Sequence, residues 1–242
     1  GVASCLALLA IPFLTPPPVE AWPCLAISIA AQTLYYFVLV EAYREGDLSL
    51  VYPVMRGTSL AVIVSFSVLG AGESLTAAKG AGLALLFLGI ALAVDPSAWR
   101  RPQTRRPALY AALTGLSVAV YLLADGVGAR RSPQAFGYVA WMFFLSGLPV
   151  VLYVGVLSGN RLARAWRRNW RHGFASGTIM AAGYGAVVWA LSLGTFATVA
   201  ALREMTTVFT ALIARFVLGE QPPLRRWAAV GFIVAGAVAI TA

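Results

Sequence analysis

The sequence predicts an all-α protein that crosses a membrane many times. Of its 242 residues, 60% are hydrophobic and 11% are charged, whereas a soluble domain of this size carries about 25% charged residues. The mean hydropathy is +0.80. Long apolar runs recur along the whole chain, and they are too continuous for the alternating segments of about ten residues that build a membrane β-barrel.

Nine apolar runs are expected to form helices, because about 20 apolar residues rising about 1.5 Å each cross a hydrocarbon layer about 30 Å thick. The loops between them are short, which favours packing between neighbours in the sequence. The first run is a partial span that stops at the prolines 16–18. The expected runs are 1–14, 24–43, 50–70, 78–95, 108–126, 136–157, 173–192, 196–218 and 226–242.

Turn-forming and polar stretches separate these runs. Gly46, between two acidic residues, suits the end of a helix. The longest polar stretch near the middle divides the chain into residues 1–95, a basic linker at 96–107, and residues 108–242. Glycines are frequent within the fourth and the last run, where small residues let membrane helices approach closely.

The two halves repeat one charged pattern inside apolar runs. Arg56 precedes Glu73 by 17 residues, and Arg203 precedes Glu220 by 17 residues. The two copies are offset by 147 positions, and a glycine precedes the glutamate in each. An arginine in hydrocarbon costs roughly 2.5–3.5 kcal/mol on insertion scales. Two such residues at matched positions predict two halves that are built alike, a pattern that transporters show.

The net charge of +9 is best explained by membrane topology, since arginine gathers in cytoplasmic loops. Nucleic-acid binding is the less favoured explanation, because the arginine runs lie between apolar spans. The arginine-rich loops 100–106 and 161–171 fall on one predicted side, which we expect to be cytoplasmic. The same side holds Arg44, Arg225 and Arg226, and the opposite loops hold Lys79, Arg130 and Arg131.

We expect Arg56 and Arg203 to line a central cavity and to meet an anionic group of a substrate. Helical spacing places Tyr52 on the face of Arg56, and Glu204 is the neighbour of Arg203. The alternative is that each arginine reaches the membrane interface or pairs with a carboxylate. Glu204 is a candidate internal partner of Arg203 in that case.

Tyrosines near the middle of spans are further candidates for substrate contact, whereas aromatic residues near span ends usually anchor the interface. They are Tyr36, Tyr121 and Tyr184. Tyr121 belongs to a polar stripe that ends at Asp125, and we expect this stripe to face other helices or water. Hydrogen bonding between helices and contact with substrate are equally good explanations for it.

The glycine-glutamate pairs at span ends are expected to be structural, capping a helix or pairing with an arginine. They are Gly72, Glu73, Gly219 and Glu220. No catalytic, metal-binding or phosphate-binding pattern accompanies them, and the single histidine, His172, lies in an arginine-rich loop. We therefore expect no enzyme activity, no metal and no cofactor.

Two segments resemble a known family. AYREGDLSLVYPVMRGTS at 42–59 resembles the first repeat of the EamA family of the drug/metabolite transporter superfamily, and residues 201–240 resemble its second repeat. The resemblance implies ten helices in two inverted five-helix repeats, of which this chain is expected to lack the first helix and part of the second. It also implies that Arg56 and Arg203 match recurrent arginines of the two repeats.

Together these observations predict a secondary transporter that moves an amino-acid-like, anionic or zwitterionic metabolite across the inner membrane by alternating access. A membrane scaffold or regulatory subunit without transport is one alternative, and a lipid flippase is another. A scaffold is expected to hold both arginines sealed by carboxylates. The expected partners are the solute, the lipid bilayer and a coupling proton or ion; a homodimer is left open, and no nucleic acid is expected.

Overall fold

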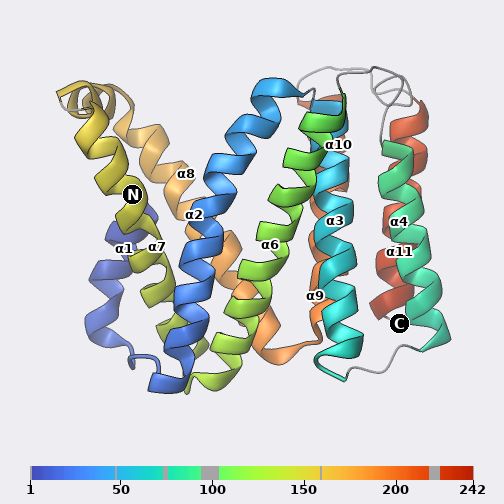
Figure 1. The fold of residues 1–242 in the computed structure, drawn as a ribbon, viewed down its shortest axis with the longest axis horizontal. Helices are drawn as coiled ribbons and strands as arrows, with labels where there is room; N and C mark the ends of the chain where they lie inside the picture. Colours follow the sequence, from blue (N-terminus) through green and yellow to red (C-terminus); the bar gives the residue numbers. More distant parts are fainter. Residues whose placement is uncertain are drawn as a thin grey trace. The chain divides into compact units, whose positions relative to one another are not determined.

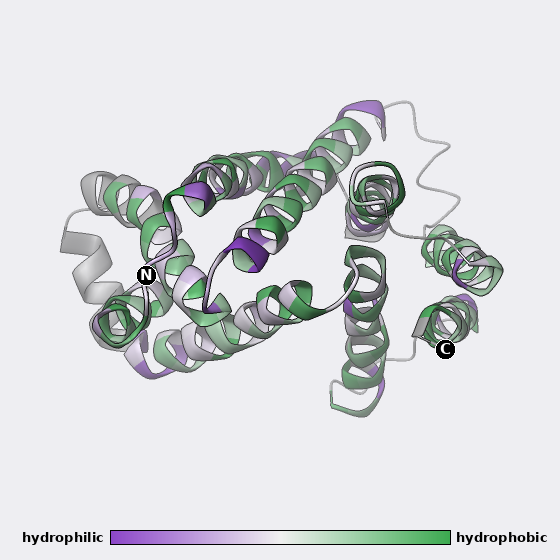
Figure 2. Cartoon of the chain, turned by 90° about the horizontal axis from the view of Figure 1, so that it is seen from below, coloured by the Kyte–Doolittle hydropathy of each residue, from purple (hydrophilic) through white to green (hydrophobic). Residues whose placement is uncertain are grey.

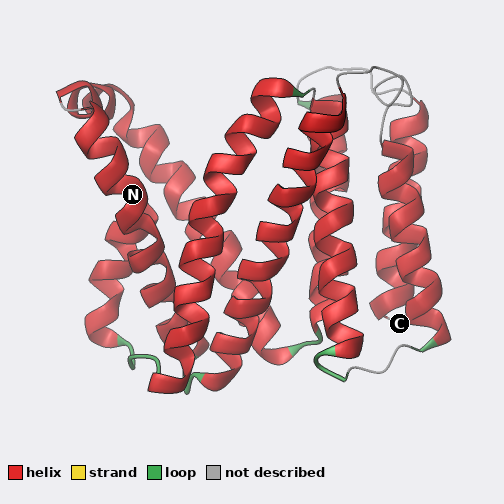
Figure 3. Cartoon of the chain, in the orientation of Figure 1, coloured by secondary structure: helices red, strands yellow, loops and turns green. Residues whose placement is uncertain are grey.

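A computed structural model of the chain describes residues 2–46, 48–72, 76–93, 104–158, 160–217 and 224–241. These residues form helices and connecting loops, and no strand occurs among them (Figure 3). The predicted all-α fold is therefore confirmed. The helices labelled in Figure 1 are α1 (Val2–Ala10), α2 (Trp22–Glu45), α3 (Leu48–Leu69), α4 (Ala77–Ala93), α6 (Arg105–Arg131), α7 (Ala135–Ser158), α8 (Asn160–Leu193), α9 (Phe196–Arg203), α10 (Met205–Phe216) and α11 (Leu224–Thr241).

Five segments within the described residues are long and apolar enough to cross a membrane. They are Val19–Glu45, Leu50–Leu69, Arg105–Arg131, Asn169–Leu193 and Phe196–Ile213. Shorter apolar helices cover Val2–Phe13, Ala77–Ala93 and Ala135–Pro149. Hydrophobic residues dominate along most helices in Figure 2, and each of the nine expected runs overlaps a helix, which confirms a multi-pass membrane protein.

Two boundaries differ from the prediction. The arginine-rich segment expected as a loop is helical from Asn160, and α8 only kinks at Asn169, where φ is −123° and ψ is 16°. Arginine, leucine and alanine are strong helix formers, so charge moves such a segment out of the bilayer without ending the helix. The run 196–218 is the second difference, because its helix is interrupted at Glu204.

The chain forms two compact units, and each takes residues from both predicted repeats. Unit 1 comprises Gly1–Leu34 and Val120–Leu193, and unit 2 comprises Tyr35–Ala119 and Gly194–Ala242. Helices α2 and α6 therefore contribute residues to both units. The repeat limits at 95 and 108 remain a prediction from the sequence.

In unit 2, glycines let α4 and α11 pack backbone against backbone. A Cβ added to Gly236 would lie 2.6 Å from the carbonyl oxygen of Gly82, and a Cβ added to Gly82 would lie 2.7 Å from that of Gly236. Such distances leave no room for a methyl group. The expected close approach of membrane helices at small residues is thus found at this pair.

Replacing Gly236 with alanine is expected to push α11 away from α4 and to destabilise the protein. Overpacking costs about 1–3 kcal/mol, and each kcal/mol lowers the melting temperature of a chain this size by about 2–4 °C. Thermal unfolding in detergent measures the effect. Gly231→Ala on the same helix is the matched control, because no atom lies within 4 Å of its added Cβ. Equal melting temperatures for the two variants would contradict the packing argument.

Candidate functional site

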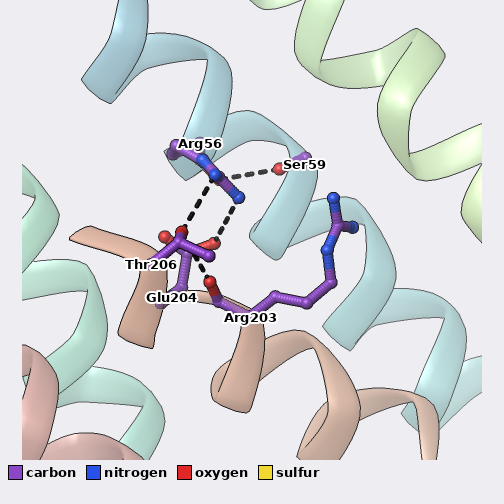
Figure 4. A network of polar contacts seen from close by, with 5 residues as sticks. All are labelled: Arg56, Ser59, Arg203, Glu204 and Thr206. Carbon is purple, nitrogen blue, oxygen red and sulfur yellow. Dashed lines mark hydrogen bonds and ion pairs between the residues drawn. The ribbon is translucent and has the colours of Figure 1, made fainter. Parts of the chain in front are cut away.

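A buried ion pair joins α3 to the junction between α9 and α10 within unit 2 (Figure 4). Nη1 of Arg56 lies 3.5 Å from Oε1 of Glu204. The Arg56 side chain is 18% exposed and Glu204 is 3% exposed. Charges buried in an apolar setting are costly unless their geometry is excellent, so the details of this contact decide how firmly it holds.

The contact between Arg56 and Glu204 is loose. Charge-assisted N–H···O bonds are normally about 2.7–2.9 Å long, and arginine commonly holds a carboxylate with two parallel bonds. Arg56 instead uses its two terminal nitrogens for two different residues: Nη1 faces Glu204, and Nη2 donates to Oγ1 of Thr206 at 3.1 Å. Oε2 of Glu204 is buried and has no hydrogen-bond partner among the described residues. The carboxylate can therefore accept a further donor.

The helix is interrupted at the residue that carries this carboxylate. The N–H of Glu204 donates to Ala201 O, and the N–H of Thr207 donates to Glu204 O, each at 3.0 Å. In both bonds the donor and acceptor are three residues apart, as in a 3₁₀-helix, instead of four residues apart as in an α-helix. The Thr206 hydroxyl donates to Arg203 O at 2.8 Å and accepts from Arg56, so it ties the interruption to the cation. Glu204 keeps right-handed helical backbone angles, with φ −68° and ψ −16°, so α9 and α10 join through a single 3₁₀ turn.

Aromatic rings lie next to the ion pair and between the helices that carry it. The guanidinium carbon of Arg56 lies 5.2 Å from the ring centroid of Tyr52, one turn earlier on α3. Farther along α3, the ring of Phe66 meets the ring of Phe196 on α9 edge to face, with centroids 5.6 Å apart. The structure thus brings together the predicted site residues Arg56, Tyr52 and Glu204.

Glu204 pairs with Arg56 from the other predicted repeat rather than with its neighbour Arg203, which corrects the partner suggested by the sequence. Adjacent residues on a helix point about 100° apart and do not face each other. In Figure 4 the Arg203 side chain extends away from the Glu204 carboxylate. No ion pair joins Arg203 to any residue within the described ranges.

A second polar cluster lies in unit 1 around Asp125 of α6. Oδ1 of Asp125 accepts from the Tyr138 hydroxyl at 3.1 Å, and Oδ2 accepts from the Tyr184 hydroxyl at 2.6 Å. The rings of Tyr121 and Tyr184 are 5.9 Å apart. Asp125 and Tyr138 are not among the site residues predicted from the sequence. The polar stripe in the sequence indicated that Asp125 faces other helices or water, whereas nothing in the sequence singles out Tyr138.

The remaining predicted site residues lie outside both clusters. Tyr36 is 44% exposed, and its ring centroid is 5.3 Å from that of Tyr35. Gly72 follows α3 with φ 65°, in the left-handed region that glycine enters without strain. The other three residues of the predicted structural pairs, Glu73, Gly219 and Glu220, lie outside the described residues.

The helices and the buried ion pair define a multi-pass membrane protein with charged groups inside an apolar span. Residues 105–242 match the sequence model of the EamA-like transporter family. The match covers more than half of the chain, so the protein belongs to this family, within the drug/metabolite transporter superfamily. A protein solved by crystallography, 20% identical in sequence, matches 99% of this chain and 85% of its own chain with a TM-score of 0.74, which supports the fold.

Proposed function

We propose that this EamA-family protein is a secondary transporter that moves a small, amino-acid-like anionic or zwitterionic metabolite across the inner membrane by alternating access. The observation that carries the proposal is the loose Arg56–Glu204 pair at an interrupted helix, with its long contact of 3.5 Å. A structural pair would be expected to satisfy every polar atom, whereas Oε2 of Glu204 is left without a partner within the described ranges.

In this mechanism Arg56 binds the anionic group of the solute. A guanidinium matches a carboxylate or a phosphate with two parallel hydrogen bonds, which the present contact to Glu204 does not use. Glu204 holds Arg56 when no solute is bound, and the solute displaces it. Thr206 keeps the guanidinium in place during the exchange through its 3.1 Å hydrogen bond.

Arg203 supplies a second cation from the second predicted repeat. A scaffold would seal both arginines with carboxylates, but of these two arginines only Arg56 has an ion pair to a carboxylate among the residues that the structure describes. This difference favours a transporter over a scaffold or regulatory subunit. We further propose that the arginine-rich segments 100–106 and 161–171 face the cytoplasm, because they hold most of the arginines between the apolar spans.

A solute screen on proteoliposomes tests the proposed function. Vesicles containing the purified protein are loaded with unlabelled amino acids, carboxylates or phosphate-bearing metabolites, and the uptake of labelled solute is measured with and without a proton gradient. We expect exchange of at least one anionic or zwitterionic solute above the level of empty vesicles. Exchange of cationic solutes alone, or no exchange by folded protein across the screen, would refute the proposal.

Replacing Arg203 with alanine is expected to raise the KM for the solute and to leave membrane insertion unchanged. The second cation would be lost, while the ion pair of Arg56 would stay intact. The matched control is Arg215→Ala on α10, since Arg215 is exposed and is expected to act at the membrane interface. Equal transport by both variants and the unmodified protein would exclude Arg203 from solute binding.

A further inference from the structure

We propose that Asp125, held by Tyr138 and Tyr184, is a proton-binding site, and that the proton bound there is the coupling ion of transport. This inference rests on the proposed function and deepens it, because it assigns the coupling ion to a named group. The site lies in unit 1, whereas Arg56 and Glu204 lie in unit 2. In this proposal the proton and the solute therefore bind to different residues.

The geometry around Asp125 is that of a carboxyl group enclosed by hydroxyls. Asp125 is 0% exposed. Its two oxygens accept from Tyr138 on α7 at 3.1 Å and from Tyr184 on α8 at 2.6 Å. Ser28 on α2 is also 0% exposed and lies beside the same carboxyl group. Three helices therefore surround one carboxyl group of a fourth.

No cation balances this carboxyl group within the described part of the chain. The titratable groups that face the cluster are Tyr138 from α7, Tyr184 from α8 and Cys24 from α2, and none of these side-chain types is cationic. Arg130 on α6 donates to the backbone carbonyl of Leu191 at 2.9 Å. No ion pair in the described ranges involves Asp125.

A proton is the counter-charge that fits this site. An ionised carboxylate inside a membrane protein is costly without a partner, and a proton from the aqueous phase removes that cost by forming one O–H bond on the carboxylate. A tyrosine hydroxyl both donates and accepts hydrogen bonds. The Tyr138 bond can therefore reverse and accept from the protonated Asp125, with no movement of the heavier atoms.

Helix α6 contributes Asp125 to unit 1 and Gly115 to unit 2. Gly115 on α6 packs against α3, since a Cβ added there would collide with the carbonyl oxygen of Met55 and lie 2.9 Å from Cβ of Thr58. Met55 immediately precedes Arg56. The ten residues from Gly115 to Asp125 span about 15 Å of helix.

Replacing Asp125 with asparagine is expected to separate solute counterflow from accumulation driven by a proton gradient. We expect Asp125→Asn to keep solute counterflow at equal pH on both sides, and to lose accumulation driven by a proton gradient down to the level of empty vesicles. Ser117→Ala is the matched control, because Ser117 is a buried polar residue of the same helix that donates to the backbone carbonyl of Leu113. That control is expected to retain both activities.

The outcomes that overturn the inference are distinct from those that overturn the transport proposal. Gradient-driven accumulation by Asp125→Asn at the unmodified level would overturn it, and so would loss of counterflow in this variant when it is folded. If Asp125→Asn does not fold, Tyr138→Phe and Tyr184→Phe replace it: each is expected to change the pH dependence of accumulation, and an unchanged profile in both overturns the inference.

A spectroscopic measurement tests the inference without any solute. Infrared difference spectra between acidic and alkaline buffer are expected to show the carbonyl band of a buried protonated carboxyl group, and Asp125→Asn is expected to lack it. The absence of that band from the unmodified protein, or its persistence in the folded variant, overturns the proton site. A failed solute screen together with the expected band would overturn the transport proposal and the coupling role, and would leave the proton-binding site at Asp125 standing.

Discussion

Replacing Arg56 with alanine is expected to lower solute counterflow by about 10- to 100-fold. The loss of a charge-assisted hydrogen bond to the solute costs about 1.5–3 kcal/mol, and each 1.4 kcal/mol corresponds to about a tenfold change in affinity. Arg56→Lys is expected to give an intermediate value, because lysine keeps the charge and loses the planar fork. Initial rates over a range of solute concentrations in proteoliposomes measure both variants.

Arg44→Ala is the matched control for the Arg56 prediction. Arg44 also pairs with a glutamate, at 3.6 Å, but its side chain is 75% exposed, and exposed pairs contribute about 0–1 kcal/mol. This variant is expected to transport like the unmodified protein. Unmodified kinetics in a folded Arg56→Ala variant would show that the solute does not bind this guanidinium.

The sequence predicts the helices well because the bilayer imposes their length and apolar character. It also points to Arg56 and Arg203, because a cation inside an apolar run is too costly to be incidental. The segment after Asn160 was predicted wrongly as a loop for a related reason. Its arginines exclude it from hydrocarbon, yet their helix propensity keeps it helical outside the spans.

The partner of Arg56 is beyond the reach of local sequence patterns. Glu204 lies 148 positions away, and helical spacing relates only residues a few positions apart. The interruption at Glu204 cannot be predicted from the residue types around it. No glycine or proline lies there, and arginine, glutamate and methionine all favour helices. Tyr138 is one of several side chains with a polar group in its apolar run, and only packing shows that it meets Asp125.

Replacing Glu204 with glutamine is expected to tighten the binding of an anionic solute by up to about tenfold and to slow its release. The substitution removes the negative charge that competes with the solute for Arg56, while the side chain keeps its size and a hydrogen-bonding oxygen. The long contact places this competing charge-assisted hydrogen bond at the low end of the usual range, about 1.5 kcal/mol, which corresponds to about a tenfold change in affinity. Equilibrium binding in detergent and the rate of counterflow measure the two effects.

The double variant Arg56→Ala/Glu204→Gln tests whether the two residues act as a pair. Arg56→Ala alone leaves a buried carboxylate without its cation, which typically costs about 3–5 kcal/mol of stability, so the added Glu204→Gln change is expected to restore part of the thermal stability. Effects of paired residues do not add, and additive effects would exclude the pair. If Glu204→Gln weakened solute binding as strongly as Arg56→Ala does, the carboxylate would be contacting the cationic group of a zwitterionic solute instead of competing with its anion.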